Sequence, residues 1–228
     1  MEHPGAVQDL LLAVFFVLAA LAGRNILNTG FIERPLVLGL FWWGCTGEYA
    51  PALPLAIFFE LFWLDLIPSG GYIPPGAFFP YLMVLLLSRQ FGWNNSASLA
   101  IPLAVTLPLA YVIPWLESRQ RDYQKFASSR LTGEARKNFP LGALPLRLIT
   151  ISAAQQGIGV LCVFIGTHVL ASHIFMQLHD YITFSSSGAS WGILYIVAAV
   201  GSLLSLRIYR AYVFFFVCMA LLFVNKIA

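Results

Sequence analysis

Long apolar runs fill most of this chain, separated by short polar or proline- and glycine-containing stretches. A helix needs roughly 20 apolar residues to cross the hydrocarbon of a bilayer, and several of these runs are too short to cross it alone. The run over residues 99–116 contains three prolines, which should kink its helix. The pattern predicts an all-α polytopic membrane protein with kinked, short and re-entrant helices. The runs cover residues 10–23, 35–47, 52–67, 77–87, 99–116, 148–172, 191–206 and 211–224.

The most abrupt break in the pattern is residues 68–76, which read PSGGYIPPG between two apolar runs. Three prolines and three glycines in nine residues cannot continue a helix. Irregular backbone at membrane depth is tolerated only inside protein or beside a water-filled cavity, because its polar groups need partners. Short apolar runs beside such breaks indicate the binding site of a transporter.

Composition agrees with a lipid environment for the whole chain. Of its 228 residues, 59% are hydrophobic and 10% are charged, whereas soluble domains carry about 25% charged residues. We expect one transmembrane domain over residues 1–228. No segment between the apolar runs is long enough for a soluble catalytic domain.

The charges predict how the chain is oriented. The first nine residues contain Glu2 and Asp9 but no basic residue, so we expect a retained helix rather than a cleavable signal peptide. Residues 117–147 hold seven of the 13 basic residues. The positive-inside rule makes this polar loop cytoplasmic. Residues 173–190 are polar and serine-rich, and we expect them outside the hydrocarbon or lining a cavity.

Two carboxylates in the third apolar run are the main candidates for chemistry. Glu60 lies among large apolar side chains, where a charge is costly unless it is paired, protonated or hydrated. Asp65 follows next to the broken stretch. Either acid can bind sugar hydroxyls through charge-assisted hydrogen bonds. The alternatives are a structural ion pair or a helix-capping acid for Glu60 and an interfacial position for Asp65. Trp63, between them, is a candidate for stacking on a sugar ring or for anchoring at the interface.

Other chemistry has little support. The pair of acids lacks the water-accessible cleft that glycosidase-like catalysis needs. The histidines lack the i, i+4 spacing of a helical zinc site, and no nucleotide-binding motif is present. Cys45, Cys162 and Cys218 lie in apolar runs without metal-ligand spacing, and we expect them to pack between helices. We therefore expect no catalytic residue, no metal, no cofactor and no nucleic-acid partner.

A series of residues resembles a known family. It comprises the segment from Arg34 to Val37 (RPLV), Gly47, Glu60-Leu61, Gly70-Gly71 and Pro74-Pro75, and the later stretch RAYVFFF from Arg210 is also similar. These features resemble the mannose/sorbose-type IIC subunit of the bacterial phosphotransferase system (PTS). The chain differs from that pattern at Gly76, where an Asp is usual, at Asp65, where a Gly is common, and at Phe59, where a small residue is usual.

The resemblance implies a permease subunit in the bacterial inner membrane, not an enzyme. With a IID membrane subunit it would pass a hexose inward, in a homo-oligomer of IIC–IID units. The phosphoryl group would come from phosphoenolpyruvate through cytoplasmic IIA and IIB phosphocarriers, which hold the phosphorylated histidines. The expected substrate-binding residues are Glu60, Asp65, Gly70, Gly71, Pro74 and Pro75, with Asn28 and Gln155 as additional polar lining.

Two other functions remain open at this point. The departures at Gly76 and Asp65 also suit a non-transporting membrane scaffold derived from this family. A polytopic membrane enzyme that uses Glu60 and Asp65 on a lipid-linked substrate is the third hypothesis.

Overall fold

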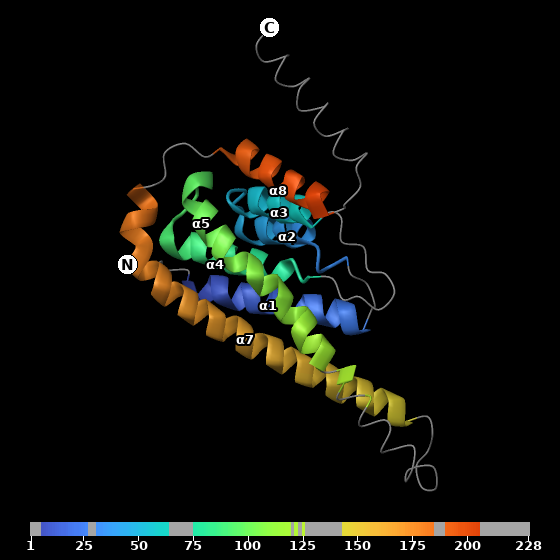
Figure 1. Ribbon diagram of the computed structural model, residues 1–228. Helices are drawn as coiled ribbons and strands as arrows, with labels where there is room; N and C mark the ends of the chain where they lie inside the picture. The colour runs from blue at the N-terminus through green and yellow to red at the C-terminus, as the bar shows by residue number, and fades with distance from the viewer. Residues whose placement is uncertain are drawn as a thin grey trace.

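The computed structural model describes residues 6–26, 31–63, 75–119, 121–122, 125, 143–184 and 190–205, and every regular element among them is helical (Figure 1). The all-α prediction is confirmed. Helix α1 (Ala6–Ile26) has 21 residues, about 32 Å at 1.5 Å per residue. The predicted run 211–224 and most of the predicted loop 117–147 lie outside the described residues.

Helices α2 (Pro35–Thr46) and α3 (Ala52–Phe62) form a short pair that packs side by side. Proline suits the first position of α2 because that position needs no backbone N–H. Gly47 ends α2 with φ 74°, a left-handed conformation that glycine adopts without strain. The two helices have 12 and 11 residues, about 18 and 16 Å, so neither can cross a bilayer by itself.

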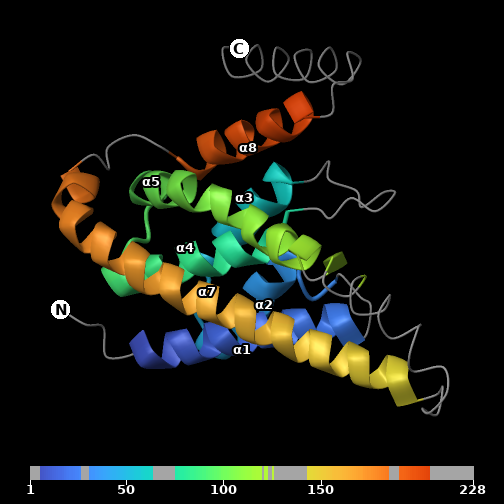
Figure 2. The same ribbon diagram turned by 60° about the horizontal axis from the view of Figure 1, so that its bottom comes forward.

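Helix α4 (Phe78–Phe91) is the centre of the molecule (Figure 2). It contacts α1, α2, α3, α5 and α7, and every residue from Phe78 to Ser88 is buried. Its 14 residues measure about 21 Å, well short of a 30 Å hydrocarbon core. A helix that is apolar on all sides must be surrounded by other elements. The short run predicted at residues 77–87 is therefore a buried half-span helix.

The helical segment Ser96–Arg119 follows α4 and contains the three prolines at which kinks were predicted. It consists of α5 (Ser96–Thr106), a 3₁₀ turn η1 (Leu107–Tyr111) and a further helical stretch over residues 112–119. Pro108 has no N–H to bond the preceding turn, and the chain tightens to 3₁₀ geometry there. The Thr106 hydroxyl donates a hydrogen bond to the carbonyl of Pro102 at 2.8 Å.

Helix α7 (Ala143–Phe184) differs from the sequence prediction. A helix end was expected at Ser172, but the helix continues to Phe184. No proline or glycine occurs between Thr167 and Phe184, and the extra turns pack on the molecule. Phe175 is buried with its ring 5.8 Å from that of Trp93, and the Ser172 hydroxyl donates to Gln90 Oε1 at 2.8 Å. Part of the stretch expected outside the hydrocarbon is therefore a packed helix.

Helix α8 (Trp191–Ser205) packs on α3 and is the last helix of the described residues. Within the described residues, two helical segments are long and apolar enough to cross a membrane, Ser96–Arg119 and Gln156–Gln177. Many large apolar side chains on the outer surface are exposed, and on α1 Val7, Leu11 and Phe15 follow one another at helical spacing. Such a surface suits lipid rather than water. Cys45 and Cys162 are also exposed, so the prediction that they pack between helices was wrong.

Candidate functional site

Glu60 lies in the last turns of α3, opposite the start of α2. Its Oε2 is 3.4 Å from Nη1 of Arg34, and its Oε1 accepts a hydrogen bond from the backbone N–H of Leu36 at 3.4 Å. The carboxylate thus occupies the N-terminus of a neighbouring helix, where unpaired N–H groups and the helix dipole favour a negative charge. The structure shows the ion pair and helix cap that were the alternatives for this residue.

These contacts leave the carboxylate with acceptor capacity. An ionised carboxylate has about four lone-pair sites, and both contacts are longer than the usual 2.9–3.0 Å for an N–H···O hydrogen bond. The Glu60 side chain is 21% exposed and that of Arg34 58%. A hydroxyl-rich ligand could therefore reach both charged groups while the ion pair limits the cost of holding them in an apolar protein.

Several helix ends meet at the level of Glu60. The ring of Phe59 packs against that of Tyr81 at 6.1 Å, which places the turn of Glu60 beside the first turns of α4. The backbone N–H of Gly76, just before α4, donates to the carbonyl of Ala110 at 2.8 Å. Ala110 lies well inside the Ser96–Arg119 segment. The start of α4, the end of α3 and the start of α2 therefore gather partway along a membrane-spanning helix.

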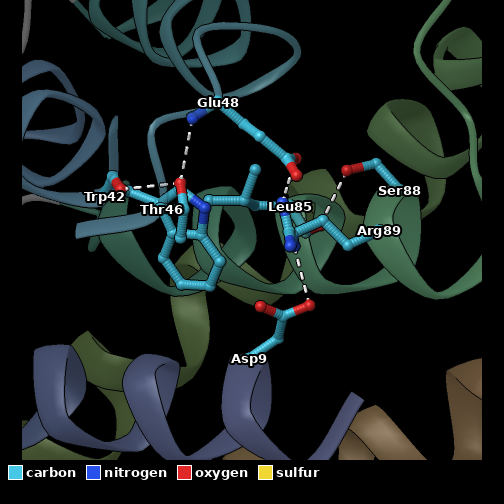
Figure 3. Close-up of polar contacts among 7 residues, drawn as sticks. All are labelled: Asp9, Trp42, Thr46, Glu48, Leu85, Ser88 and Arg89. Atoms are coloured by element: carbon cyan, nitrogen blue, oxygen red, sulfur yellow. Dashed lines mark hydrogen bonds and ion pairs between the residues drawn. The ribbon is translucent and has the colours of Figure 1, made fainter. Parts of the chain in front are cut away.

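A second charged group lies at the opposite end of α4 (Figure 3). The guanidinium of Arg89 donates from Nε to Asp9 Oδ2 of α1 at 2.7 Å, and from Nη1 to Glu48 in the connection between α2 and α3. Sequence reasoning missed this group, because its partners are 80 and 41 residues from Arg89. A signal was available: Arg89 is the single basic residue between Arg34 and Arg119, at the end of an apolar run, and such a charge needs a partner.

Comparison with known proteins identifies the family. The family model described as the PTS system sorbose-specific IIC component matches residues 6–182, more than three quarters of the chain. The chain belongs to this family. A solved chain described only as a membrane protein has the same fold, with a TM-score of 0.56 and 16% identity over 96% of this chain and 92% of the other. No curated protein sequence matches significantly.

The chain is thus a sorbose-type IIC component, a transport subunit of the phosphotransferase system. Other components of that system are implied by its family. The matched region contains the whole Arg34–Pro75 series on which the resemblance was based, and the predicted membrane fold is confirmed.

The structure places only some of the residues predicted to bind substrate. Pro75 is buried beside the start of α4. Trp63 stacks on Phe59, with ring centroids 5.6 Å apart and planes within 7°, so one of its faces is already covered. Gln155 lies in α7, but its side chain is outside the description. Asn28, Asp65, Gly70, Gly71 and Pro74 lie outside the described residues.

Gly76, where the family resemblance leads us to expect an Asp, is closely packed. A Cβ at this position would lie 3.2 Å from two atoms of Ile113, tighter than ordinary van der Waals contact. The position is buried, so a larger side chain here would have to displace Ile113. The described part of the chain contains no group of three or more His, Cys, Asp or Glu side chains able to hold a metal ion.

Proposed function

We propose that this IIC component is the membrane permease subunit of a phosphoenolpyruvate-dependent sugar phosphotransferase system. It binds a hexose and passes it inward across the bacterial inner membrane together with a IID subunit. The observation that carries the proposal is the partly exposed Glu60–Arg34 pair. It lies where α3 ends and α2 and α4 begin, partway along the Ser96–Arg119 segment.

The chemistry of this place suits a sugar. Hexose hydroxyls donate hydrogen bonds to carboxylates and accept them from guanidinium groups, and the paired ions offer both. Helices α2 and α4 both begin here, and the polar backbone groups of their first turns add to the site. The phosphoryl group reaches the sugar from the IIB partner, so the IIC component itself needs only to bind and release. Asp65, Gly70, Gly71 and Pro74 remain predicted contributors, with Asn28 and Gln155 as further lining.

The orientation follows from the charges. We infer that residues 117–147 face the cytoplasm, because basic residues concentrate there. The Ser96–Arg119 segment ends and α7 begins at the same end of the molecule (Figure 1), and both belong to that side. The connection between α4 and α5 then faces outward. A cysteine replacing exposed Asn94 should react with an impermeant maleimide from outside the cell, and one replacing exposed Asp122 only in inverted vesicles. The reverse pattern would overturn the orientation.

The central test is Glu60→Gln in vesicles that contain the chain with its IID partner, supplied with IIA, IIB and phosphoenolpyruvate. The substitution keeps the shape but removes the charge that strengthens hydrogen bonds to sugar hydroxyls, a difference of about 1.4 kcal/mol or more, so we expect at least a roughly tenfold loss of hexose phosphorylation. Asp122→Asn is the matched control, because that acid is 73% exposed and its ion pair among the described residues is with nearby Lys125. Unchanged phosphorylation in Glu60→Gln refutes the role of Glu60.

The same preparation separates the other two functions. A chain that copurifies with IID but binds no hexose in any variant is a scaffold. Activity on a lipid-linked substrate without partners or a phosphoryl donor would indicate a membrane enzyme.

A further inference from the structure

Arg89 lies between two carboxylates that differ in their surroundings. Asp9 is buried, with 10% of its side chain exposed, and the Arg89 side chain is 13% exposed. The Glu48 side chain is 55% exposed. One ion pair is therefore inside the protein and the other at its surface, although they share a single guanidinium.

The local structure directs Glu48 towards Arg89. At the end of α2, the Thr46 hydroxyl donates to the carbonyl of Trp42 at 2.9 Å and accepts the backbone N–H of Glu48 at 3.3 Å. The chain turns there, and Figure 3 shows the Glu48 side chain reaching down to Arg89 while Asp9 approaches from the other side. The contact joins the outer end of the α2–α3 pair to the last turn of α4.

The two ion pairs differ in what their loss leaves behind. If Glu48 moves away, the buried pair of Asp9 and Arg89 remains and is neutral. If Asp9 is removed, Arg89 loses its buried partner, which is strongly destabilising. An exposed ion pair is weak and screened by salt. The group is thus built with one fixed contact and one that opens at low cost.

The helices joined by this group form two packed sets. Helices α2 and α3 pack closely on each other, and α3 on α8, whereas α4 is surrounded mainly by α1, α5, η1 and α7. We propose that the Glu48–Arg89 ion pair is a releasable latch that holds the α2–α3 pair against α4, while Asp9–Arg89 fixes Arg89 in place. Because the α2–α3 pair carries Glu60 at its other end, opening the latch alters access to that residue. The latch itself stands whether or not Glu60 binds sugar.

The test uses the full chain in lipid vesicles, with its three cysteines replaced by serine and Ala52→Cys as the probe. Ala52 is 1% exposed, and its carbonyl accepts the Tyr81 hydroxyl of α4 at 3.2 Å, so separation of the α2–α3 pair from α4 should expose a thiol there to maleimide. Glu48→Gln should raise the labelling rate about two- to fivefold, the range expected for loss of an exposed ion pair. Added salt should raise it in the parent but not in Glu48→Gln.

Asp9→Asn and Asp122→Asn complete the comparison. Asp9→Asn should lower the thermal stability clearly, whereas Glu48→Gln should leave it nearly unchanged, and Asp122→Asn should alter neither quantity. Equal labelling of Glu48→Gln and its parent, or a loss of stability in Glu48→Gln as large as in Asp9→Asn, overturns the latch. If the Ala52→Cys chain fails to fold, hydrogen exchange of α2–α3 peptides in the otherwise native chain makes the same comparison, and equal exchange rates overturn the latch in the same way.

Discussion

Gly39 in α2 offers a quantitative test of how closely the α2–α3 pair is packed. A Cβ at Gly39 would lie 2.9 Å from the Cβ of Ala56 and 3.1 Å from the Tyr81 hydroxyl. The Ala56 Cβ is held by its backbone and cannot rotate away, so Gly39→Ala must push α2 and α3 apart. The same shift strains the buried hydrogen bond from Tyr81 to the carbonyl of Ala52.

The expected magnitude of Gly39→Ala combines three effects on the free energy of unfolding. Over-packing costs about 1–3 kcal/mol. Loss of the Tyr81 hydrogen bond costs about 1 kcal/mol. Replacing a mid-helix glycine by alanine returns about 1 kcal/mol. The net destabilisation is about 2 kcal/mol, which lowers Tm by about 4–8 °C in a chain of this size.

Gly44 is the matched control, because it lies in the same helix and a Cβ there meets nothing within 4 Å. Gly44→Ala should raise Tm by about 2–4 °C, since only the gain in helix propensity remains. Thermal unfolding of both variants in the same detergent, followed by tryptophan fluorescence, provides the comparison. If Gly39→Ala is as stable as Gly44→Ala, the close packing of α2 on α3 is wrong.

Two further predictions concern other contacts. Gly76→Asp, which introduces the residue expected from the family resemblance, should destabilise the chain by about 2 kcal/mol or more because it buries a carboxylate against Ile113. Ile113→Ala should relieve part of that loss in the double variant, and additive Tm changes would contradict the contact. Phe175→Ala should cost about 3–5 kcal/mol, because this side chain is 1% exposed beyond the helix end expected at Ser172. Met176→Ala, at a neighbouring position that is 63% exposed, should change Tm little. Equal changes in Tm for these two variants would contradict the burial of Phe175 on this face of α7.

Helix positions were predictable where proline, glycine or aromatic residues mark the ends of apolar runs. The run beginning at Pro35 is α2, the run beginning at Trp191 is α8, and Pro108 of the run 99–116 lies in the 3₁₀ turn. The error at Ser172 has a physical cause. Polar side chains there suggested a boundary, but Phe175 and Ser172 find partners on Trp93 and Gln90, and tertiary contacts prolong the helix.

The site was less predictable than the helices. A carboxylate in an apolar run identified Glu60, but its contacts with Arg34 and Leu36 depend on α2 and α3 lying side by side, and they join residues 26 and 24 positions apart. The Asp9–Arg89–Glu48 group depends on three elements meeting at one end of the molecule. Periodicity along a chain specifies which face of a helix is apolar, whereas pairing between helices depends on the tertiary arrangement.

The complete burial of α4 has a consequence for how the protein is assembled. With 14 residues it is too short to be held in lipid as an independent span, and the backbone groups just before its first turn, such as the N–H of Gly76, would find no partners there. One of those partners, the carbonyl of Ala110, is synthesised later, as is Phe164, whose ring packs on Phe79 at 5.3 Å. The native surroundings of α4 are therefore complete only after α5 and α7 have been synthesised. The central helix of the protein depends on parts of the chain that are made after it.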